Sequence, residues 1–280
     1  MNLILQGLKT ERAAIDGIVA MAQAQEVKTI GAHAWRCEGV RDSEVLKTQV
    51  DAACLALELD YAFIDAGRNL ADFKLVAMDM DSTLITIECI DEIADMQGLK
   101  PQVAQITEAA MRGEIEFGES LRQRVALLTG LDAGALLRVY DERLQLSPGA
   151  EKMLQAVQAA GLKTLLVSGG FTFFTDRMKQ RLKLDYSHAN ELEIVDGKLT
   201  GKLVGGIVDA EEKKRTVQRV CAELGVPTSE AIVMGDGAND LGMMSVSGLS
   251  LAFRAKPVVR AQAAVSLNFV GLDGILSILA

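Results

Sequence analysis

Leu75-Val-Ala-Met-Asp79-Met-Asp81-Ser-Thr-Leu84 joins an uninterrupted apolar run to two carboxylates. A run of this length is typical of a strand that is buried on both faces. Similar runs occur at 164–167, 231–234 and 249–253, and helical patterns such as 151–160 lie between them. This alternation predicts an α/β fold, with a doubly wound parallel sheet covered by helices on both faces.

Two segments interrupt the alternation. Residues 85–146 show only helical periodicity, which predicts an all-helical insertion placed like a cap after the first strand. Residues 191–200 contain Asp196-Gly197 between two β-prone runs, and this pattern predicts a hairpin. We expect the hairpin to form a small flap or an extension of the sheet.

Residues 1–72 differ from the remainder of the chain. Their pattern predicts the order β-α-β-α, with β-prone runs at 3–6 and 27–35 and helices near 11–23 and 42–59. We therefore expect a small N-terminal α+β domain, a linker at 69–72, and a second domain over 73–280.

Composition narrows the function. The 280 residues carry a formal net charge of -9, which argues against nucleic-acid binding because that function needs a basic surface. The four cysteines are scattered without a C-x-x-C pair, a distribution that fits a reducing cytoplasm. Neither a signal peptide nor a long apolar run for a membrane span is visible.

Polar groups follow three of the predicted strands. Ligand sites of parallel sheets lie beyond the carboxyl ends of the strands, so these groups should converge. Asp79 and Asp81 can attack phosphorus and handle a proton, and Ser168-Gly-Gly170 can bind phosphoryl oxygens. Gly235-Asp-Gly-Ala-Asn-Asp240 can hold Mg²⁺ through its carboxylates. Each motif alone also fits a cap or a tight turn, but the three together predict a phosphoryl site.

Further candidates are charged side chains near apolar faces. Lys213 and Lys214 both border the buried face of a predicted helix, and spacing does not choose between them. Arg124 falls on the apolar face of its helix, whereas Arg122 does not. Glu88 lies where the chain enters the helical insertion.

Together these residues resemble the haloacid dehalogenase superfamily, and more closely its phosphoserine phosphatases. The resemblance covers roughly 74–280. It is carried by four motifs in order: 79–84, 167–170, Lys213 and 235–240. Two further stretches, 88–93 and 117–125, are similar to the cap of the phosphoserine branch. Gly242 stands where many relatives have proline, which affects only the local turn.

The resemblance implies roles that the residues alone leave open. It implies hydrolysis of O-phosphoserine through an aspartyl-phosphate, as the last step of serine biosynthesis, and it favours Lys213 over Lys214. It implies catalysis by Asp79, Asp81 and Lys213, and Mg²⁺ binding by Asp79, Asp236 and the backbone carbonyl of Asp81, with Asp240 supporting the metal shell. It implies substrate binding by Glu88, Arg124, Ser168, Gly169, Lys213 and Asn239.

Alternatives remain at this point. One is a phosphatase or phosphotransferase that acts on another small phosphomonoester. Another is an amino-acid-sensing regulator, but the intact acidic set and Lys213 argue against an inactive scaffold. Some members of the superfamily carry an ACT-like domain at the N-terminus, so the resemblance also implies a possible homodimer through residues 1–72.

Overall fold

The computed structural model describes residues 1–280 and contains one continuous sheet of 11 strands. The strand order is β2-β3-β1-β4-β11-β10-β9-β5-β6-β7-β8. From β11 to β7 the strands are parallel, and β4–β11 and β7–β8 are antiparallel pairs. The six parallel strands are β5 (Leu75–Met78), β6 (Lys163–Phe171), β7 (Tyr186–Val195), β9 (Ala231–Gly235), β10 (Leu249–Phe253) and β11 (Val265–Leu267).

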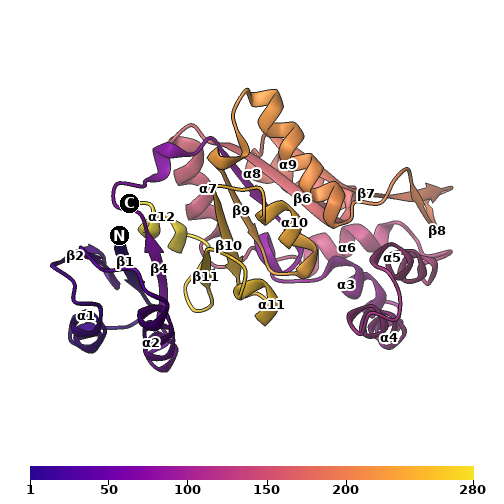
Figure 1. Ribbon diagram of the computed structural model, residues 1–280. Helices are drawn as coiled ribbons and strands as arrows, with labels where there is room; N and C mark the ends of the chain where they lie inside the picture. Colours follow the sequence, from indigo (N-terminus) through magenta and orange to yellow (C-terminus); the bar gives the residue numbers. More distant parts are fainter.

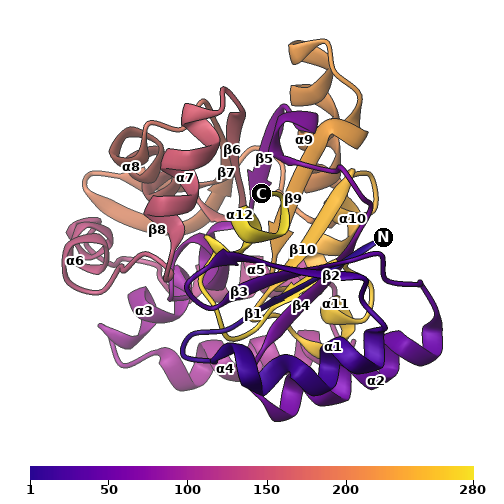
Figure 2. The same ribbon diagram turned by 90° about the vertical axis from the view of Figure 1, so that its left-hand side faces the viewer.

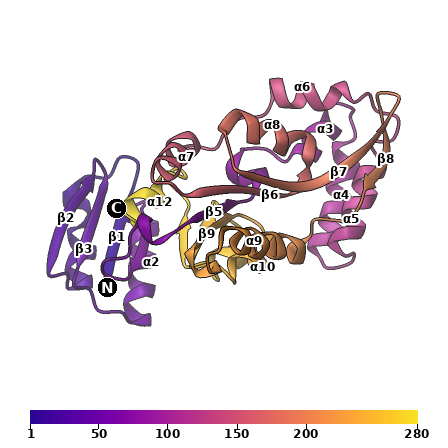
Figure 3. The same cartoon turned by 90° about the horizontal axis from the view of Figure 1, so that it is seen from above.

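Helices cover both faces of the parallel strands, as the apolar runs predict. Figure 3 shows α9 (Ala210–Leu224) and α10 (Leu241–Met244) on one side, and α7 (Ala150–Ala159) and α8 (Thr172–Leu182) on the other. The runs are apolar throughout because alternate side chains enter different cores. In β5, Val76 and Met78 join the larger cluster, and Leu75 and Ala77 join the smaller one below α9. The short helices α11 (Pro257–Arg260) and α12 (Gly274–Ile278) complete the C-terminal part.

The N-terminal part is β-α-β-β-α-β rather than the expected β-α-β-α. Its elements are β1 (Asn2–Gln6), α1 (Asp16–Ala22), β2 (Glu26–Gly31), β3 (Ala34–Glu38), α2 (Glu44–Ala56) and β4 (Asp60–Ile64). The run predicted as one strand turns back at residues 32–33. In Figure 2, α1 and α2 lie together on one face of these strands.

This part is not separated from the rest of the sheet. Tyr61 of β4 pairs with Ser266 of β11, and Ile4 and Ala62 belong to the main core. The buried carboxylate of Asp60 accepts backbone hydrogen bonds from residues 268, 269 and 270 at 2.7–2.9 Å. Strand pairing, apolar packing and a buried carboxylate therefore all join residues 1–64 to the parallel strands.

The insertion between β5 and β6 is helical, as expected. It contains α3 (Cys89–Asp95), α4 (Lys100–Met111), α5 (Phe117–Ala126) and α6 (Gly134–Glu142), and we refer to residues 85–146 as the cap segment. It lies at the opposite end of the molecule from β1–β4 (Figure 1). Its two ends meet where Ile85 pairs with Leu146. No helix is long and apolar enough to cross a lipid bilayer.

The predicted hairpin is present as β7 and β8 (Lys198–Val204), with Asp196 and Gly197 at positive φ in the turn. Its tip pairs with the loop between α5 and α6. Gly130 N–H donates to the Leu199 carbonyl and Leu199 N–H to the Leu131 carbonyl, both at 2.8 Å. The hairpin thus connects the sheet to the cap segment.

Candidate functional site

The strand ends that the sequence singled out are adjacent in space. β9, β5 and β6 are neighbours in the sheet, and their carboxyl ends border a cavity of about 1070 Å³ below the cap segment. The lining includes Asp79, Asp81, Ser168, Gly169, Asp236 and Asn239 from the sheet. Glu88 and Arg124 line the same cavity from the cap side.

Lys213 is fully buried beside the cavity. Asp209 begins α9 by accepting a hydrogen bond from Glu212 N–H at 2.9 Å, and this helix places Lys213 Nζ 2.9 Å from Asp79 Oδ1 and 2.8 Å from Asp240 Oδ1. Burial lowers the pKa of Lys213, but the charges of Asp240 and Asp79 outweigh burial and raise that pKa above its usual value. Lys213 is therefore a permanent cation, and Lys214 is not part of the contact.

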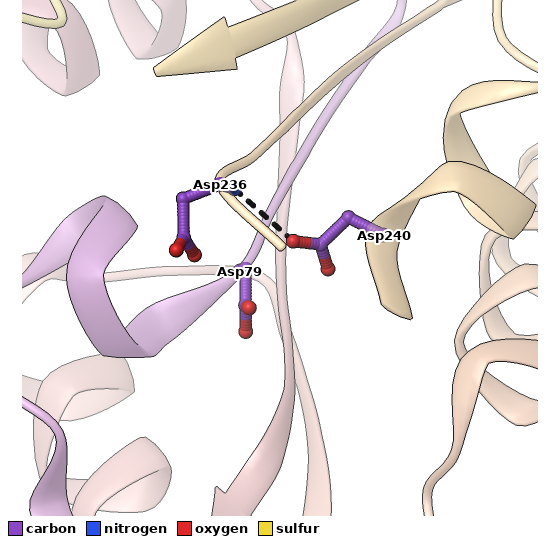
Figure 4. A group of neighbouring side chains, drawn as sticks. All are labelled: Asp79, Asp236 and Asp240. Carbon is purple, nitrogen blue, oxygen red and sulfur yellow. Dashed lines mark hydrogen bonds between the residues drawn. The ribbon is translucent and has the colours of Figure 1, made fainter. Parts of the chain in front are cut away.

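Three carboxylates gather next to this lysine. Asp79, Asp236 and Asp240 each offer an oxygen within 4.8 Å of the others (Figure 4). Both oxygens of Asp240 already have protein partners, because Lys213 binds one and the N–H groups of Asp236 and Gly237 donate to the other at 3.1 and 3.0 Å. Asp240 thus shapes the turn that presents Asp236.

Asp236 is less satisfied by the protein. Its only side-chain partner is the Thr83 hydroxyl, which donates at the long distance of 3.4 Å. Burial and the neighbouring Asp240 raise the pKa of Asp236 to about 6. An incompletely paired carboxylate beside Asp79 is the donor set that a hard divalent cation prefers. The acidic cluster therefore fits a divalent metal site.

Asp79 lies between opposing influences. Burial and the charge of Asp240 raise the pKa of Asp79, and the Lys213 ammonium at 2.9 Å opposes this rise. Asp79 Oδ1 also accepts a hydrogen bond from Met80 N–H at 2.7 Å. A cation held by Asp79 and Asp236 would act in the same sense as Lys213 and keep Asp79 ionised.

Asp81 occupies a different environment on the same turn. It is half-buried and accepts a hydrogen bond from Cys89 N–H at 3.2 Å. Burial, and next the charge of Glu88, raise the pKa of Asp81 to about 7. A carboxyl group with that pKa exchanges a proton readily near neutral pH. The two aspartates of this turn therefore differ: Asp79 lies next to the ammonium of Lys213, whereas Asp81 titrates near neutral pH.

Two charged side chains face the cavity from the cap side. Glu88 Oε1 accepts a hydrogen bond from the Ser82 hydroxyl at 2.7 Å, and Ser82 adopts a left-handed backbone conformation with φ 56°. Arg124 Nε lies 3.4 Å from the Ser120 carbonyl, and burial lowers the pKa of this guanidinium against the opposing charges of Asp91 and Glu88. Arg122 is solvent-exposed on the same helix.

The turn after β6 offers polar groups on the remaining side. Ser168 is buried, and its hydroxyl accepts a hydrogen bond from Gly170 N–H at 2.8 Å. A Cβ atom at Gly170 would lie 2.6 Å from Asp81 Oδ2, so only glycine allows this approach. Asn239 lines the cavity from the turn that follows β9.

The structure also brings in residues that the sequence did not single out. Asp91 and Lys256 line the cavity, and the buried Asn190 bonds to the Gly169 carbonyl. Asp91 lies one helical turn after Glu88, a spacing that points to the same face. Lys256 and Asn190 come from elements distant in sequence, and no local pattern identifies them.

Comparison with known proteins now bears on this arrangement. Residues 73–248 match the family model described as haloacid dehalogenase-like hydrolase. The chain belongs to the haloacid dehalogenase-like hydrolase family. In this hydrolase the matched region contains the three strand ends, the cap segment and Lys213.

Curated relatives are similar over most of this hydrolase. The phosphoserine phosphatase of Polaromonas sp. is 57% identical over 215 residues, which cover 75% of this chain and 91% of that protein. The phosphoserine phosphatase of Haemophilus influenzae is 47% identical over 223 residues, covering 80% and 71% respectively.

Solved structures share the fold. A haloacid dehalogenase family hydrolase from Salmonella enterica serovar Typhi has a TM-score of 0.90 at 30% identity, with 100% of this chain and 99% of that chain covered. A probable phosphoserine phosphatase from Vibrio cholerae has a TM-score of 0.85 at 37% identity, with coverage of 99% and 86%. A substrate-bound phosphoserine phosphatase complex has a TM-score of 0.70 at 35% identity, with coverage of 74% and 99%.

Proposed function

We propose that this hydrolase converts O-phosphoserine and water into serine and phosphate, the last step of serine biosynthesis. The observation that carries the proposal is that Glu88 and Arg124 line the same cavity as Asp79, whose carboxylate contacts the buried Lys213. A carboxylate and a guanidinium can bind the ammonium and carboxylate of one amino acid, while its phosphate lies against the sheet. The names of the curated relatives support the same substrate.

In the first step, a carboxylate oxygen of Asp79 attacks phosphorus and the bond from phosphorus to the serine oxygen breaks. Asp81 gives its proton to that departing oxygen, and the product is serine with phosphate bound covalently to Asp79. The pKa of about 7 for Asp81 keeps a substantial fraction of this group protonated at neutral pH. Burial and Asp240 raise the pKa of Asp79, so its attacking carboxylate would be kept ionised by Lys213 at 2.9 Å together with a cation in the acidic cluster.

In the second step, the now ionised Asp81 takes a proton from water. The water oxygen attacks phosphorus, the acyl-phosphate bond breaks, and the Asp79 carboxylate is restored together with a phosphate ion. Asp81 regains the proton that it lost. The two aspartates therefore keep separate roles through the whole cycle.

We assign Mg²⁺ to the acidic cluster. The carboxylates of Asp79 and Asp236 and the backbone carbonyl of Asp81 would hold the ion, and Asp240 would support the turn from its bonds to residues 236 and 237. When bound, Mg²⁺ supplies positive charge against the phosphoryl oxygens. Chelation should abolish turnover and Mg²⁺ should restore it, whereas full activity after exhaustive chelation would refute the assignment.

The remaining residues bind the phosphoryl group. Ser168, the Gly169 backbone and Asn239 line the same cavity as Asp79, and Lys213 adds a fixed charge through its contact with Asp79. Such preorganised donors oppose negative charge without having to reorient during the reaction.

The decisive experiment compares phosphoserine with phosphoethanolamine, which keeps the ammonium group but lacks the carboxylate. Arg124→Ala should lower kcat/KM for phosphoserine by roughly 10- to 200-fold, the effect of one charge-assisted hydrogen bond. It should change phosphoethanolamine much less, and Glu88→Gln should impair both. Arg122→Ala is the matched control, because Arg122 is exposed on the same helix. Equal losses for both substrates in Arg124→Ala would refute recognition of the carboxylate by Arg124.

We further propose that residues 1–72 form an ACT-like domain that pairs two copies of the chain in the cytoplasm. The β-α-β-β-α-β order supports a ferredoxin-like unit, and four unpaired, buried cysteines fit a reducing compartment. Sedimentation of the purified chain should give the mass of a dimer, and a monomer at micromolar concentration would contradict the pairing.

A further inference from the structure

The ladder between β6 and β7 is interrupted beside the phosphoryl-binding turn. Val167 lies opposite His188, and Phe171 lies opposite Asn190. From one pair to the next the chain advances by four residues in β6 but by only two in β7. The two additional residues form a bulge that turns the backbone after Val167 toward the cavity. A bulge leaves backbone groups without ladder partners, and those groups need other hydrogen bonds when they are buried.

The side chain of Asn190 supplies these bonds. Its Nδ2 donates to the Gly169 carbonyl at 2.8 Å, and its Oδ1 accepts from Val208 N–H at 2.8 Å. Asn190 is only 1% exposed, so water does not compete for either bond. A carbonyl on one side and an N–H on the other fix the orientation of the amide. Only a side chain that donates and accepts at once can satisfy both.

Both partners belong to parts of the catalytic apparatus. Gly169 is in the phosphoryl-binding turn, and Val208 precedes Asp209, which begins the helix that carries Lys213. On the cavity side, a Cβ atom at Gly169 would lie 3.2 Å from the ring of Phe117 in the cap segment. Asn190 therefore holds the turn through the Gly169 carbonyl, and the ring of Phe117 approaches the same turn from the cavity.

We infer that Asn190 is a positioning residue that holds the phosphoryl-binding turn at a fixed distance from the start of the Lys213 helix. It touches no reacting atom. The inference rests on the proposed phosphatase function of the cavity. The proposed contacts with the amino-acid part of the substrate come from the cap side. Asn190 should therefore affect binding of the phosphoryl group and leave the discrimination between phosphoserine and phosphoethanolamine unchanged.

Two variants separate the two bonds. Asn190→Asp keeps an acceptor for Val208 N–H but cannot donate to Gly169 when ionised, whereas Asn190→Leu removes both bonds. Asn69→Asp is the matched control, because Asn69 begins a turn near the surface and aspartate serves equally well there. For each protein in Mg²⁺ buffer we would measure the thermal unfolding curve, the Kd of inorganic phosphate, kcat and KM, and amide hydrogen exchange at residue 208.

Both variants at position 190 should bind inorganic phosphate more weakly and lose roughly 10- to 100-fold in kcat/KM while folded. The ratio of kcat/KM for phosphoserine over phosphoethanolamine should stay at the wild-type value. Residue 208 should exchange faster in Asn190→Leu alone. Should Asn190→Leu not fold, the phosphate Kd of Asn190→Asp decides the question. Wild-type phosphate affinity in a folded variant, or a changed substrate ratio, would overturn the inference. Because phosphate binding does not depend on which ester is hydrolysed, a wild-type enzyme inactive on phosphoserine would refute the proposed substrate only.

Discussion

At the scale of single residues, the site depends on a contrast between two aspartates of one turn. Asp79 lies beside the ammonium of Lys213, and Asp81 is half-buried near Glu88 with its pKa raised to about 7. The two aspartates have different roles because of neighbouring residues, Lys213 and Glu88, that lie outside the motif 79–84. Two consequences can be measured.

The first consequence concerns the leaving group. Nitrophenolate departs without a proton, whereas the serine oxygen needs one. Asp81→Asn should therefore slow the first step by at least about 100-fold for phosphoserine, the usual size of a general-acid contribution, and much less for p-nitrophenyl phosphate. Rapid mixing should show a burst of nitrophenol as the phosphoenzyme accumulates, because the second step also needs Asp81. Equal losses in the first step for both esters would remove Asp81 as the acid.

The second consequence is a dependence on pH. Since the raised pKa of Asp81 means that the protonated form is lost as pH rises, kcat/KM for phosphoserine should decline above about pH 7, approaching tenfold per unit. Below about pH 6 the substrate loses its second phosphate charge, and activity should fall again. The alkaline decline should vanish in Asp81→Asn. A profile that is flat from pH 7 to pH 9 in the wild-type enzyme would contradict the assignment.

At the scale of elements, the hairpin of β7 and β8 determines how firmly the cap segment is held. Gly201 has φ 80°, and a Cβ atom there would collide with the Thr129 hydroxyl in the turn that follows α5. This close approach accompanies the backbone bonds from Gly130 and Leu131 to the hairpin. Because α5 carries Arg124, the hairpin contributes to the position of a substrate-binding side chain.

Gly201→Val should push the hairpin away from the cap segment. We expect KM for phosphoserine to rise by roughly 10-fold, because a small displacement of Arg124 weakens a hydrogen bond worth about 1.5–3 kcal/mol. The kcat for p-nitrophenyl phosphate, which does not use Arg124, should change little. The control is Gly205→Val at the end of β8, where a Cβ atom would meet nothing and φ is also positive. An unchanged KM in a folded Gly201→Val variant would show that the cap segment is held without this contact.

At the scale of the whole molecule, the sheet continues across the boundary between residues 1–72 and the remainder. Asp60 fixes that junction with three backbone hydrogen bonds from residues 268–270. No strand pairing beyond Tyr61 with Ser266 supports β4 against β11. At this junction the carboxylate of Asp60 therefore provides hydrogen bonds that a longer β-ladder provides between the other neighbouring strands.

Asp60→Asn should destabilise the chain, because an amide oxygen accepts fewer bonds and its NH₂ group would face N–H donors. The expected loss is about 1.5–3 kcal/mol, or roughly a 5 °C lower Tm for a chain of this size. Asp51→Asn serves as the control, since Asp51 is exposed and accepts one bond from Tyr61 OH at 3.1 Å. A Tm within 1 °C of wild type, a margin of about 0.5 kcal/mol, would show that the junction does not need the charge.

The sequence predicts most of the fold because buried parallel strands are continuous apolar runs. The runs at 75–78, 164–167, 231–234 and 249–253 all lie in observed strands. The strand Val265–Leu267 is not predicted, because three residues are too few to show a periodicity. The turn at residues 32–33 is missed because the β-prone run continues through Gly31 without a proline or a two-residue turn signal such as Asn-Gly.

For the site, motifs at strand ends predict which residues converge, but spacing leaves Lys213 and Lys214 equivalent. The choice depends on how α9 packs against β5 and the turn after β9. Asn190 could not be predicted for a similar reason. Its two partners, Gly169 and Val208, are brought together only by the register shift in the sheet.

The cap segment is attached at both of its ends and again at the hairpin tip, so the cavity is covered by a structure held at three places. Under the proposed recognition, Glu88 and Arg124 also require a free ammonium and a free carboxylate. A phosphoserine inside a polypeptide has neither group and brings a bulky chain on both sides. The enzyme would therefore hydrolyse free phosphoserine and leave phosphoserine residues of cellular proteins intact. Biosynthesis and signalling could then use the same phosphorylated amino acid without interfering with each other.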